Sequence, residues 1–563
     1  MVRKTRFFSG AREAACRPRL ITVIVASALA SISVVPTVYA FEINTGESDF
    51  KARWDTTAKY STMLRLKDPD SRLTSPAVNP NNANQNDGDN NFKKGIVSNR
   101  ADIFTELDVT YQNFGARVSA AAWYDTVYNK SNDSNDALTN NSSSVSYNNF
   151  TSNTQDLQGR KAELLDAFVF GKFELGGDKN ASIRAGRHSV LWGETLFFGA
   201  NGIAGGQAPM DYIKLLSVPS SQFKELIRPV GQVSGQFQLN SNVSFGAYYQ
   251  YKWAGNRIPA VGSYLSNEDL FVTGGENFIF PWGKEAHLQD HMPSDDGQFG
   301  FQIRFRPEGY DAEYGLYAIR YHDKNPNVYI NIGSNPVLGG AVAPVGYSLA
   351  YAEGIRAFGA SFSTTLGDAN IGGEASIRHN TPLVNPGSPN PFLTHDNSSN
   401  PGYPVGKSAH LNLSAIYLLP PSSLWQGGDL LAEVAWNRRL SVDSDPHGTL
   451  DPNSTRDAWG FRMLFQPSYY QVFAGLDLKV PIGLGYNPKG RSSVVPQFNG
   501  GVDKGGDFSI GLVGDYQKQW TLRLNYTHFL GDIGGAFDTN AHLSFQQSLK
   551  DRDFLSFSVQ TTW

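Results

Sequence analysis

The end of this chain alternates between apolar and polar side chains. In residues 555–563, one parity carries Leu555, Phe557, Val559, Thr561 and Trp563, and the other carries only serine, glutamine and threonine. Successive side chains of a β-strand point to opposite faces, so a period of two predicts a strand. We therefore predict that the chain ends in a strand with one mostly apolar face and one polar face.

The same period of two recurs along the rest of the chain. It is clear in residues 50–64, 103–111 and 118–124, and it returns in the ranges 165–175, 243–253, 299–305, 409–417, 430–436, 459–465, 472–480, 508–512 and 520–526. The longer sets approach the ~10 residues with which a tilted strand crosses a bilayer. Short turns alternate with long polar segments, and we predict roughly 16 to 18 strands, with an even number preferred.

A strand that ends the chain on an aromatic residue resembles the terminal strand of bacterial outer-membrane β-barrels, which the barrel-assembly machinery reads. The resemblance implies that Phe557, Val559 and Trp563 form the assembly signal, and that this machinery and outer-membrane lipid are partners. In such a barrel, apolar side chains face lipid and polar side chains face the lumen. We predict an all-β fold, a transmembrane antiparallel β-barrel, with a soluble β-sandwich as the alternative.

The N-terminal residues predict export from the cytoplasm. Six basic residues fall within positions 3–19, residues 20–35 are largely apolar and uncharged, and residues 38–40 form a plausible cleavage site. This pattern predicts a signal peptide over 1–40 and a barrel over 41–563. The alternative is a membrane anchor, although the apolar run is short of the ~20 residues that a span needs. Cys16 falls within the predicted signal, so cysteine usage says nothing about redox compartment.

Charge and composition agree with a barrel. Removing the predicted signal moves the formal charge from −4 to −9, and an acidic chain is a poor candidate for nucleic-acid binding. Mean hydropathy is −0.34, as expected when half of each strand is polar. Aromatic residues make up 12% of the chain and glycine occurs 56 times, which suits interfacial girdles and strand bends.

Residues 68–94, 129–155 and 380–403 are long and polar, and we predict that they are outer loops. The segment 195–229 differs, because a glycine-rich stretch is followed by apolar residues. It is too apolar for a free loop. One hypothesis is that it folds into the lumen, and the other is that it packs on the barrel rim. In the first case it forms a constriction lined by Met210, Tyr212, Ile213, Leu215 and Leu216.

The polar faces of the predicted strands carry opposite charges on neighbouring strands, which can set a field across a pore. The predicted lumen charges are Lys51, Arg53, Asp102, Glu106, Asp108, Arg184, Arg304, Glu374, Arg378, Asp477 and Lys479. The alternative is that these side chains are only the solvated interior that every barrel needs. Phe104, Phe168 and Phe170 also have inward parity, and they suggest contact with a partly apolar solute or with the segment 195–229.

Catalytic and metal-binding patterns are weak. There is no G-x-S-x-G or H-E-x-x-H pattern, and residues 402–408 resemble a phosphate-binding loop but lead into a strand. His287 and His291 have the i, i+4 spacing of metal ligands on a helix, but they lie in a polar segment. The Asn/Asp-rich residues 84–91 lack the spacing of an EF-hand. We predict no enzyme activity, no metal site and no cofactor.

Residues 186–194 carry a more specific pattern, G-R-x-x-x-x-W-G-E, with Gly186, Arg187, Trp192, Gly193 and Glu194 at its fixed positions. This pattern resembles the family called domain of unknown function 1302. Residues 220–226, with a Lys-Glu pair, and the aromatic strand end 249–253 are also similar. The resemblance is best over 181–264. It implies a Gram-negative outer-membrane protein with a role in transport or export of amphipathic solutes, and it assigns no chemistry to the pattern residues.

From position alone, Trp192 suits a rim aromatic at a sharp turn, and Arg187 and Glu194 are candidates to pair across that turn. Our leading hypothesis is an outer-membrane channel for small hydrophobic or amphipathic molecules of the lipid, sterol or aromatic class, with such a solute as its partner. The alternatives are a general diffusion porin for hydrophilic solutes, a barrel enzyme, and a structural or adhesive barrel acting through its Asn-rich loops.

Overall fold

The computed structural model describes residues 41–43, 49–218, 223–271 and 273–563. The predicted signal peptide, 1–40, lies outside the described residues. No helix among the described residues is long and apolar enough to cross a membrane.

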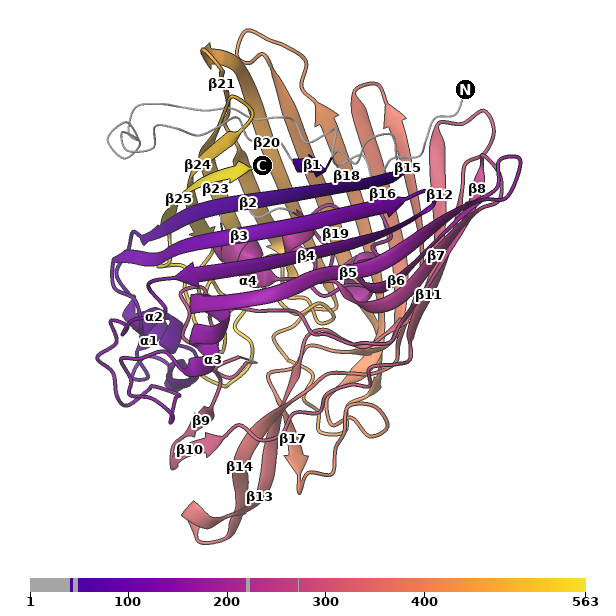
Figure 1. The fold of residues 1–563 in the computed structure, drawn as a ribbon. Coiled ribbons are helices and arrows are strands. Elements are labelled where there is room, and N and C mark those ends of the chain that lie inside the picture. The colour runs from indigo at the N-terminus through magenta and orange to yellow at the C-terminus, as the bar shows by residue number, and fades with distance from the viewer. Residues whose placement is uncertain (1–40, 44–48, 219–222, 272) are drawn as a thin grey trace.

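The described strands form a closed antiparallel barrel of 18 strands (Figure 1). Closure comes from β2 (Phe50–Arg65), which pairs with the last strand, β25 (Phe554–Thr562). β1 (Phe41–Ile43) adds a short pairing to β2. β21 (Leu476–Lys479) and β22 (Ile482–Lys489) together fill one position of the ring. The predicted all-β transmembrane barrel is confirmed, and its strand number is the upper value of the predicted range.

The other strands of the ring follow the chain from neighbour to neighbour. They are β3 (Gly95–Tyr111), β4 (Phe114–Asp125), β5 (Arg160–Glu174), β6 (Asn180–His188), β7 (Val230–Gln238), β8 (Val243–Gln250), β11 (Gln298–Phe305), β12 (Ala312–Tyr321), β15 (Ile355–Leu366), β16 (Ala369–Pro382), β18 (Val405–Leu418), β19 (Gly427–Ser444), β20 (Asp457–Phe473), β23 (Gly505–Tyr516) and β24 (Trp520–Leu530).

The two faces of the strands have opposite character. On β2, Asp55, Lys59 and Ser61 are buried, whereas Tyr60 is 44% exposed and Leu64 is also exposed. Polar side chains are thus covered inside the ring and apolar ones lie bare on its outer surface. This inversion of a soluble protein suits a barrel whose outer face meets lipid hydrocarbon.

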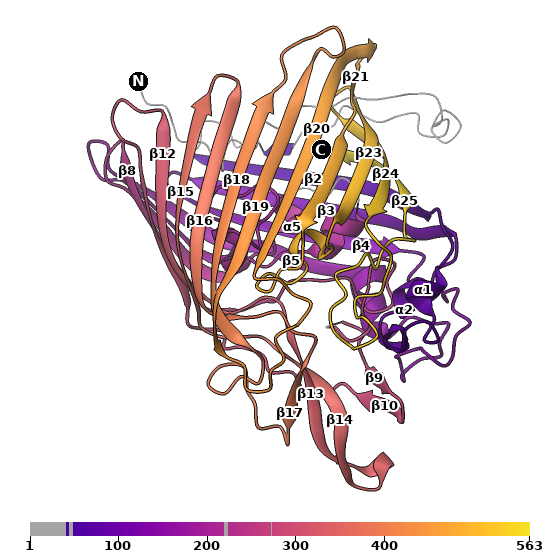
Figure 2. The same ribbon diagram turned by 180° about the vertical axis from the view of Figure 1, so that it is seen from behind.

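The two ends of the barrel differ. Short turns such as 112–113 and 517–519 join strands at the end where β25 finishes, and long loops join them at the other end (Figures 1 and 2). A hairpin of β9 (Asn277–Phe280) and β10 (Gly283–Ala286) lies at the long-loop end, with a small sheet of β13 (Asn327–Asn335), β14 (Ala341–Ala350) and β17 (Ser388–Pro391).

Short helical turns occur in these loops. They are α1 (Ser71–Thr74), η2 (Pro80–Asn84), α2 (Asp87–Asn90), α3 (Ser152–Thr154), η3 (Gln155–Gly159), η5 (Pro336–Leu338) and η6 (Phe498–Gly500). The asparagines of 68–94 bind other loops: the side chain of Asn79 donates to the carbonyl of Phe537, and that of Asn84 donates to the carbonyl of Ile279. We refer to the interlocked loops 66–94, 251–297 and 530–553 as the loop cap.

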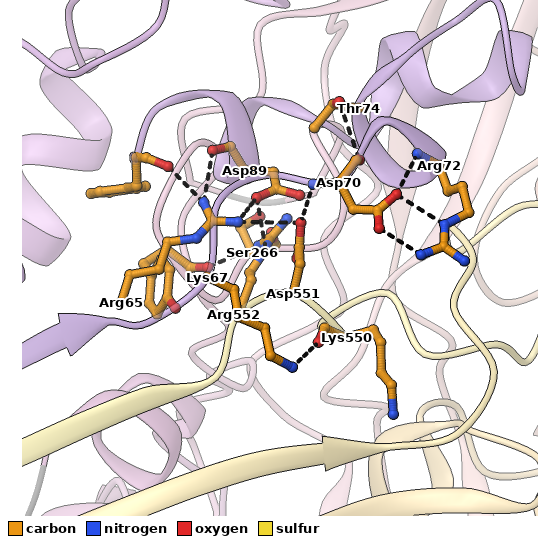
Figure 3. A network of polar contacts seen from close by, with 12 residues as sticks. Arg65, Lys67, Asp70, Arg72, Thr74, Asp89, Ser266, Lys550, Asp551 and Arg552 are labelled. Atoms are coloured by element: carbon orange, nitrogen blue, oxygen red, sulfur yellow. Dashed lines mark hydrogen bonds and ion pairs between the residues drawn. The ribbon is translucent and has the colours of Figure 1, made fainter. Parts of the chain in front are cut away.

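A buried ionic cluster joins the three loops of the cap (Figure 3). Arg65 lies 2.5 Å from Asp89 and 3.2 Å from Asp551, and all three side chains are almost fully buried. The neighbouring Arg552 donates to the carbonyl oxygens of Tyr264 and Ser266, in the loop that comes from the β8–β11 side of the ring. That loop is therefore tied to the distant seam where β2 meets β25.

Candidate functional site

The described residues between β6 and β7, 189–218 and 223–229, turn into the barrel. They contain η4 (Ile203–Gly206), α4 (Tyr212–Ser217) and α5 (Phe223–Leu226), and the views show α4 (Figure 1) and α5 (Figure 2) within the ring of strands. We refer to the described residues 189–218 and 223–229 as the lumen segment.

Two carboxylates on the barrel wall bind backbone N–H groups of the lumen segment. Glu433 of β19 accepts from the N–H groups of Leu196 and Phe198 at 3.1 and 3.0 Å, and from the N–H between them. Glu374 of β16 accepts from the N–H groups of Glu194 and Ile203. Hydrogen bonds to an ionised acceptor are stronger than neutral ones, so these carboxylates fix the first half of the segment.

The same wall also binds the carbonyl oxygens and one side chain of this stretch. Arg378 of β16 donates to the carbonyls of Ala200 and Gly202 at 3.0 and 2.9 Å. The buried side chain of Asn201 donates to Oδ1 of Asn412 at 2.9 Å, and it also bonds to β19. The backbone N–H and carbonyl groups of this stretch, and the side chain of Asn201, thus have hydrogen-bond partners on β16, β18 and β19.

The residues of the 186–194 pattern begin this attachment. Trp192 is 8% exposed and packs inside the barrel against Tyr248 and Tyr317, with ring centroids 5.0 and 6.2 Å apart. From its position in the sequence, Trp192 was expected at the barrel rim, whereas its indole packs on the inner wall. Gly193 has a φ of +98°, and a Cβ there would lie 1.9 Å from Oε2 of Glu374. Only glycine fits so close to the wall.

Gly186 and Glu194 of the pattern have separate places. Gly186 has a φ of +125°, and a Cβ there would meet the carbonyl oxygen of Ala167 at 2.4 Å. Glu194 pairs with Arg304 of β11 at 3.1 Å. The suggested pairing of Arg187 with Glu194 is therefore wrong: the chain bends at Gly193, and Glu194 meets a different strand.

The second half of the lumen segment is attached to β4 and β5. The carboxylate of Asp211 caps α4 by accepting from the N–H of Lys214 at 3.0 Å. Arg257 bridges Asp211 to Glu163 of β5, at 2.6 and 2.5 Å. The ammonium of Lys214 lies 5.3 Å from the ring centroid of Trp123 on β4, a cation–π contact.

These two attachments lie on opposite sides of the lumen. Counted along the closed ring, β16, β18 and β19 are about half-way round from β4 and β5. A segment fixed at both places crosses the interior rather than lying along one wall. Of the predicted rim and lumen positions for 195–229, the described contacts correspond to the lumen.

The apolar side chains of the segment divide into two groups. Ile213 is buried with Leu157 and Ala260. Leu215 and Leu216, on α4, are 47% and 45% exposed within the ring. Met210 and Tyr212 are half-buried. The predicted constriction residues are therefore not all on one surface, and two leucines are the most open.

Most of the predicted lumen charges are paired with a neighbour. The predicted lumen charges take part in the ion pairs Arg53–Asp55, Arg100–Asp102, Arg117–Glu106, Arg117–Asp108, Arg304–Glu313 and Lys479–Asp429. Asp477 accepts from the N–H of Gln471. Lys51 is exposed at the short-turn end of β2. The charged side chains of the inner wall thus largely neutralise one another in local pairs.

Aromatic side chains of inward parity fall into two environments. Phe104 is buried with Ala121, Trp123 and Leu165. Phe168 and Phe170 are half-buried, and the guanidinium of Arg184 lies 5.9 Å from the ring centroid of Phe168.

Several attachment residues were missed from the sequence alone. Glu433, Asn201 and Arg257 look like ordinary solvated residues, because their partners are distant in the chain. A signal was present only for Glu433, whose inward parity was visible on β19. The Gly193–Glu194 pair was noted through the family pattern without a role.

The two histidines considered as metal ligands, His287 and His291, make local contacts. The ring of His287 bonds to the carbonyl of Gly275 and to Asp290, and His291 packs edge-on against Tyr329. Among the described residues, no group of three or more His, Cys, Asp or Glu side chains is placed to hold a metal ion.

Comparison with protein families identifies this chain. The family model described as protein of unknown function (DUF1302) matches residues 21–563. The chain belongs to this family. In this DUF1302 protein, Trp192, Gly193 and Glu194 of the pattern lie where the lumen segment meets the barrel wall. The comparison with curated proteins gave no match.

The comparison with solved structures gave matches of low similarity. Acinetobacter baumannii OccAB1 has 9% identity and a TM-score of 0.42, over 91% of this chain and 96% of that chain. A BenF-like porin from Pseudomonas fluorescens Pf-5 has 9% identity and a TM-score of 0.38, over 92% and 98%. Pseudomonas aeruginosa OccK2 in complex with glucuronate has 10% identity and a TM-score of 0.37, over 91% and 97%. Likeness at this level carries no argument about the solute.

Proposed function

We propose that this protein is a channel in the outer membrane of a Gram-negative bacterium, and that it passes small hydrophobic or amphipathic molecules by passive diffusion. The solute classes are lipids, sterols and aromatic compounds. The observation that carries the proposal is the lumen segment, which is fixed to two opposite walls and exposes Leu215 and Leu216 inside the ring.

An apolar constriction discriminates between solutes. Water and ions leave such a constriction easily, because it offers them no hydrogen bonds. An apolar or amphipathic solute gains ~25 cal/mol for each Å² of apolar surface that it buries there. Passage also requires weak binding, since a tightly held solute does not leave.

The rest of the proposal concerns the surroundings of the barrel. Outer-membrane lipid contacts the exposed apolar face, and the barrel-assembly machinery reads β25. The protein is proposed to act without catalysis and without a cofactor. A general diffusion porin for hydrophilic solutes is the competing outcome of the experiment below.

The experiment compares ion conductance and solute flux. We expect the intact protein to conduct ions poorly in planar bilayers, and a variant with a Gly/Ser linker in place of 195–229 to conduct far better. In liposomes, the intact protein should pass neutral 4-phenylbutanamide faster than a sugar of similar mass.

A matched control replaces 336–340, at the β13–β14 turn outside the barrel, with the same type of linker. This variant should conduct like the intact protein. A large conductance of the intact protein, unchanged by the 195–229 linker, would overturn the proposal in favour of a general porin.

A further inference from the structure

A small cavity lies between the lumen segment and the long-loop end of the barrel. Its volume is about 60 Å³. Its lining comes from the lumen segment, from the ends of β12, β15 and β16, and from the loops around 256, 323–325 and 494–496. A buried water occupies ~10–15 Å³ on this measure, so the cavity has room for a polar head group but not for a whole drug-sized molecule.

Two cationic side chains, Lys324 and Arg378, line this cavity, and neither forms an ion pair with another described residue. Lys324 is buried, and its ammonium donates to the carbonyl of Gly206 at 2.9 Å. Arg378 is also buried, and it donates to two carbonyls of the lumen segment. Within the described part of the chain, neither cation has a carboxylate oxygen within 4.0 Å.

The charge balance of the cavity is therefore positive. Burial lowers the pKa of Lys324 to about 8, which leaves the ammonium mostly protonated at neutral pH. Burial also raises the pKa of the adjacent Asp323, the one acid among the lining residues, and its Oδ1 already accepts from the N–H of Asn325. Asp323 offsets one of the two positive charges, so the lining keeps a net positive charge in a buried site, where an anion is attracted more strongly than in water.

The remaining lining is mostly apolar. Met210 and Tyr212 belong to the lumen segment, Ile355 begins β15, and the sequence 494–496 supplies two valines and a proline. This combination of two cations and a surrounding apolar surface matches a molecule with an anionic head and an apolar body.

We propose that this cavity binds the carboxylate head of an amphipathic monoanion, whose apolar body extends along the lumen segment. The site rests on the proposed function and narrows its substrate class from amphipathic molecules in general to amphipathic carboxylates. Lys324 and Arg378 provide the charge, and the apolar lining selects against small hydrophilic anions.

The test measures binding of three probes to the full chain in detergent micelles by calorimetry, with empty micelles as the blank. The probes are 4-phenylbutanoate, its neutral amide 4-phenylbutanamide, and acetate. We expect 4-phenylbutanoate to bind at least tenfold more tightly than either of the others. Equal affinity for the carboxylate and the amide would overturn the proposal.

Variants test whether the charge of this cavity is responsible. Lys324→Gln keeps a donor for the carbonyl of Gly206 and removes the charge. It should therefore weaken the binding of 4-phenylbutanoate at least tenfold and leave the affinity for the amide unchanged. Lys284→Gln is the control, because Lys284 also donates to a loop carbonyl but lies outside the cavity. Unchanged carboxylate affinity in Lys324→Gln would contradict the proposal.

A second variant covers the case in which Lys324→Gln does not fold. Asn325→Asp keeps the oxygen that accepts from Asn256 and adds a negative charge to the lining. It should weaken the binding of 4-phenylbutanoate and leave that of the amide unchanged. If the variant bound 4-phenylbutanoate as tightly as the intact protein does, the site would be contradicted. Flux of the neutral amide through liposomes tests the channel separately: flux without carboxylate selectivity refutes only this site, and absence of flux refutes the proposed function.

Discussion

Gly193 shows how a single residue fixes the position of the lumen segment. Its positive φ and its closeness to Glu374 leave no room for a Cβ. We predict that Gly193→Ala destabilises the attachment by about 1–3 kcal/mol, because alanine at φ > 0 is strained and the carboxylate must move. In planar bilayers, the variant should show a larger and noisier ion conductance than the intact protein.

Gly199→Ala is the matched control for this prediction. Gly199 lies in the same segment, and a Cβ there has no neighbour closer than 4.0 Å. Its conductance should equal that of the intact protein. If both variants behave alike, the close approach of Gly193 to the wall is not what holds the segment.

The contacts between residues of the site were the part of the structure that the sequence predicted least well. The alternation on β16 and β19 indicated that Glu374 and Glu433 face inward, but nothing showed that they bind backbone N–H groups some 180 and 236 positions away. Arg187 and Glu194 are close in sequence and were paired on that ground. Sequence separation failed because Arg187 still lies in β6, whereas the chain bends at Gly193, which has a positive φ, and Glu194 meets β11.

At the level of single elements, the period of two predicted many of the strands. The predicted strand over 472–480 was wrong, because the chain turns at 474–475 between β20 and β21. A strand between lipid and water must place its apolar side chains on one face, so the pattern carries the orientation directly. The lumen segment has no such period, and its composition left both a rim and a lumen position open. Its place follows from contacts with β16, β18 and β19, which are formed only when the ring closes.

The outer face of β19 supplies a prediction on lipid contact. Val434 lies near the middle of this strand and is 46% exposed. Val434→Arg should destabilise the barrel by about 2–4 kcal/mol, because arginine is poorly solvated near the bilayer midplane. Reversible denaturant titration in lipid vesicles, followed by tryptophan fluorescence, measures this change.

Gln236→Arg on β7 is the inward-facing counterpart. Gln236 is exposed and shares the polar parity with Ser234, whereas Val233 lies on the opposite face. An arginine there meets water in the lumen, so stability should change little. Equal destabilisation by both substitutions would mean that the inward and outward faces are wrongly assigned.

The terminal strand carries a prediction on assembly. Trp563 exchanges backbone hydrogen bonds with Thr56 at 2.7 and 2.9 Å, and Phe557 lies opposite Thr62 and Leu524. Deleting Trp563 together with Phe557→Ser should reduce insertion into the outer membrane, because the aromatic end and part of the lipid-facing stripe are lost. Heat-modifiable migration of membrane fractions on gels reports insertion, and a normal amount of inserted barrel would refute the prediction.

On the scale of the whole molecule, the loop cap combines segments from distant parts of the chain. Residues 68–94 were predicted as an outer loop from their Asn and Asp content, which indicates exposure to water. In the folded protein, many of these side chains are buried and bind other loops. Composition could not reveal this, because the partners come from 251–297 and 530–553.

Four buried carboxyl groups make this cap sensitive to pH, and burial raises the pKa of one of them, Asp551, to about 7. Burial raises the pKa of Asp87 to about 7 and that of Glu268 to about 8. Burial and the nearby Asp87 raise the pKa of Asp269 well above its usual range. The folded cap therefore holds protons that the opened loops release, and its stability falls as pH rises from about 4, where free carboxyls ionise, to about 8.

We accordingly predict that the cap is more stable at pH 5.5 than at pH 8.5. Hydrogen exchange of residues 84–91 and 262–270, corrected for the intrinsic pH dependence of exchange, should show greater protection at the lower pH. Glu268→Gln removes the carboxyl whose pKa is about 8. This variant should flatten the dependence of protection on pH, since a neutral amide has no proton to release. Protection that instead increases with pH would mean that these carboxyls are ionised in the folded cap and stabilised by Arg552, whose charge acts on Asp269, and by Lys284, whose charge acts on Asp87.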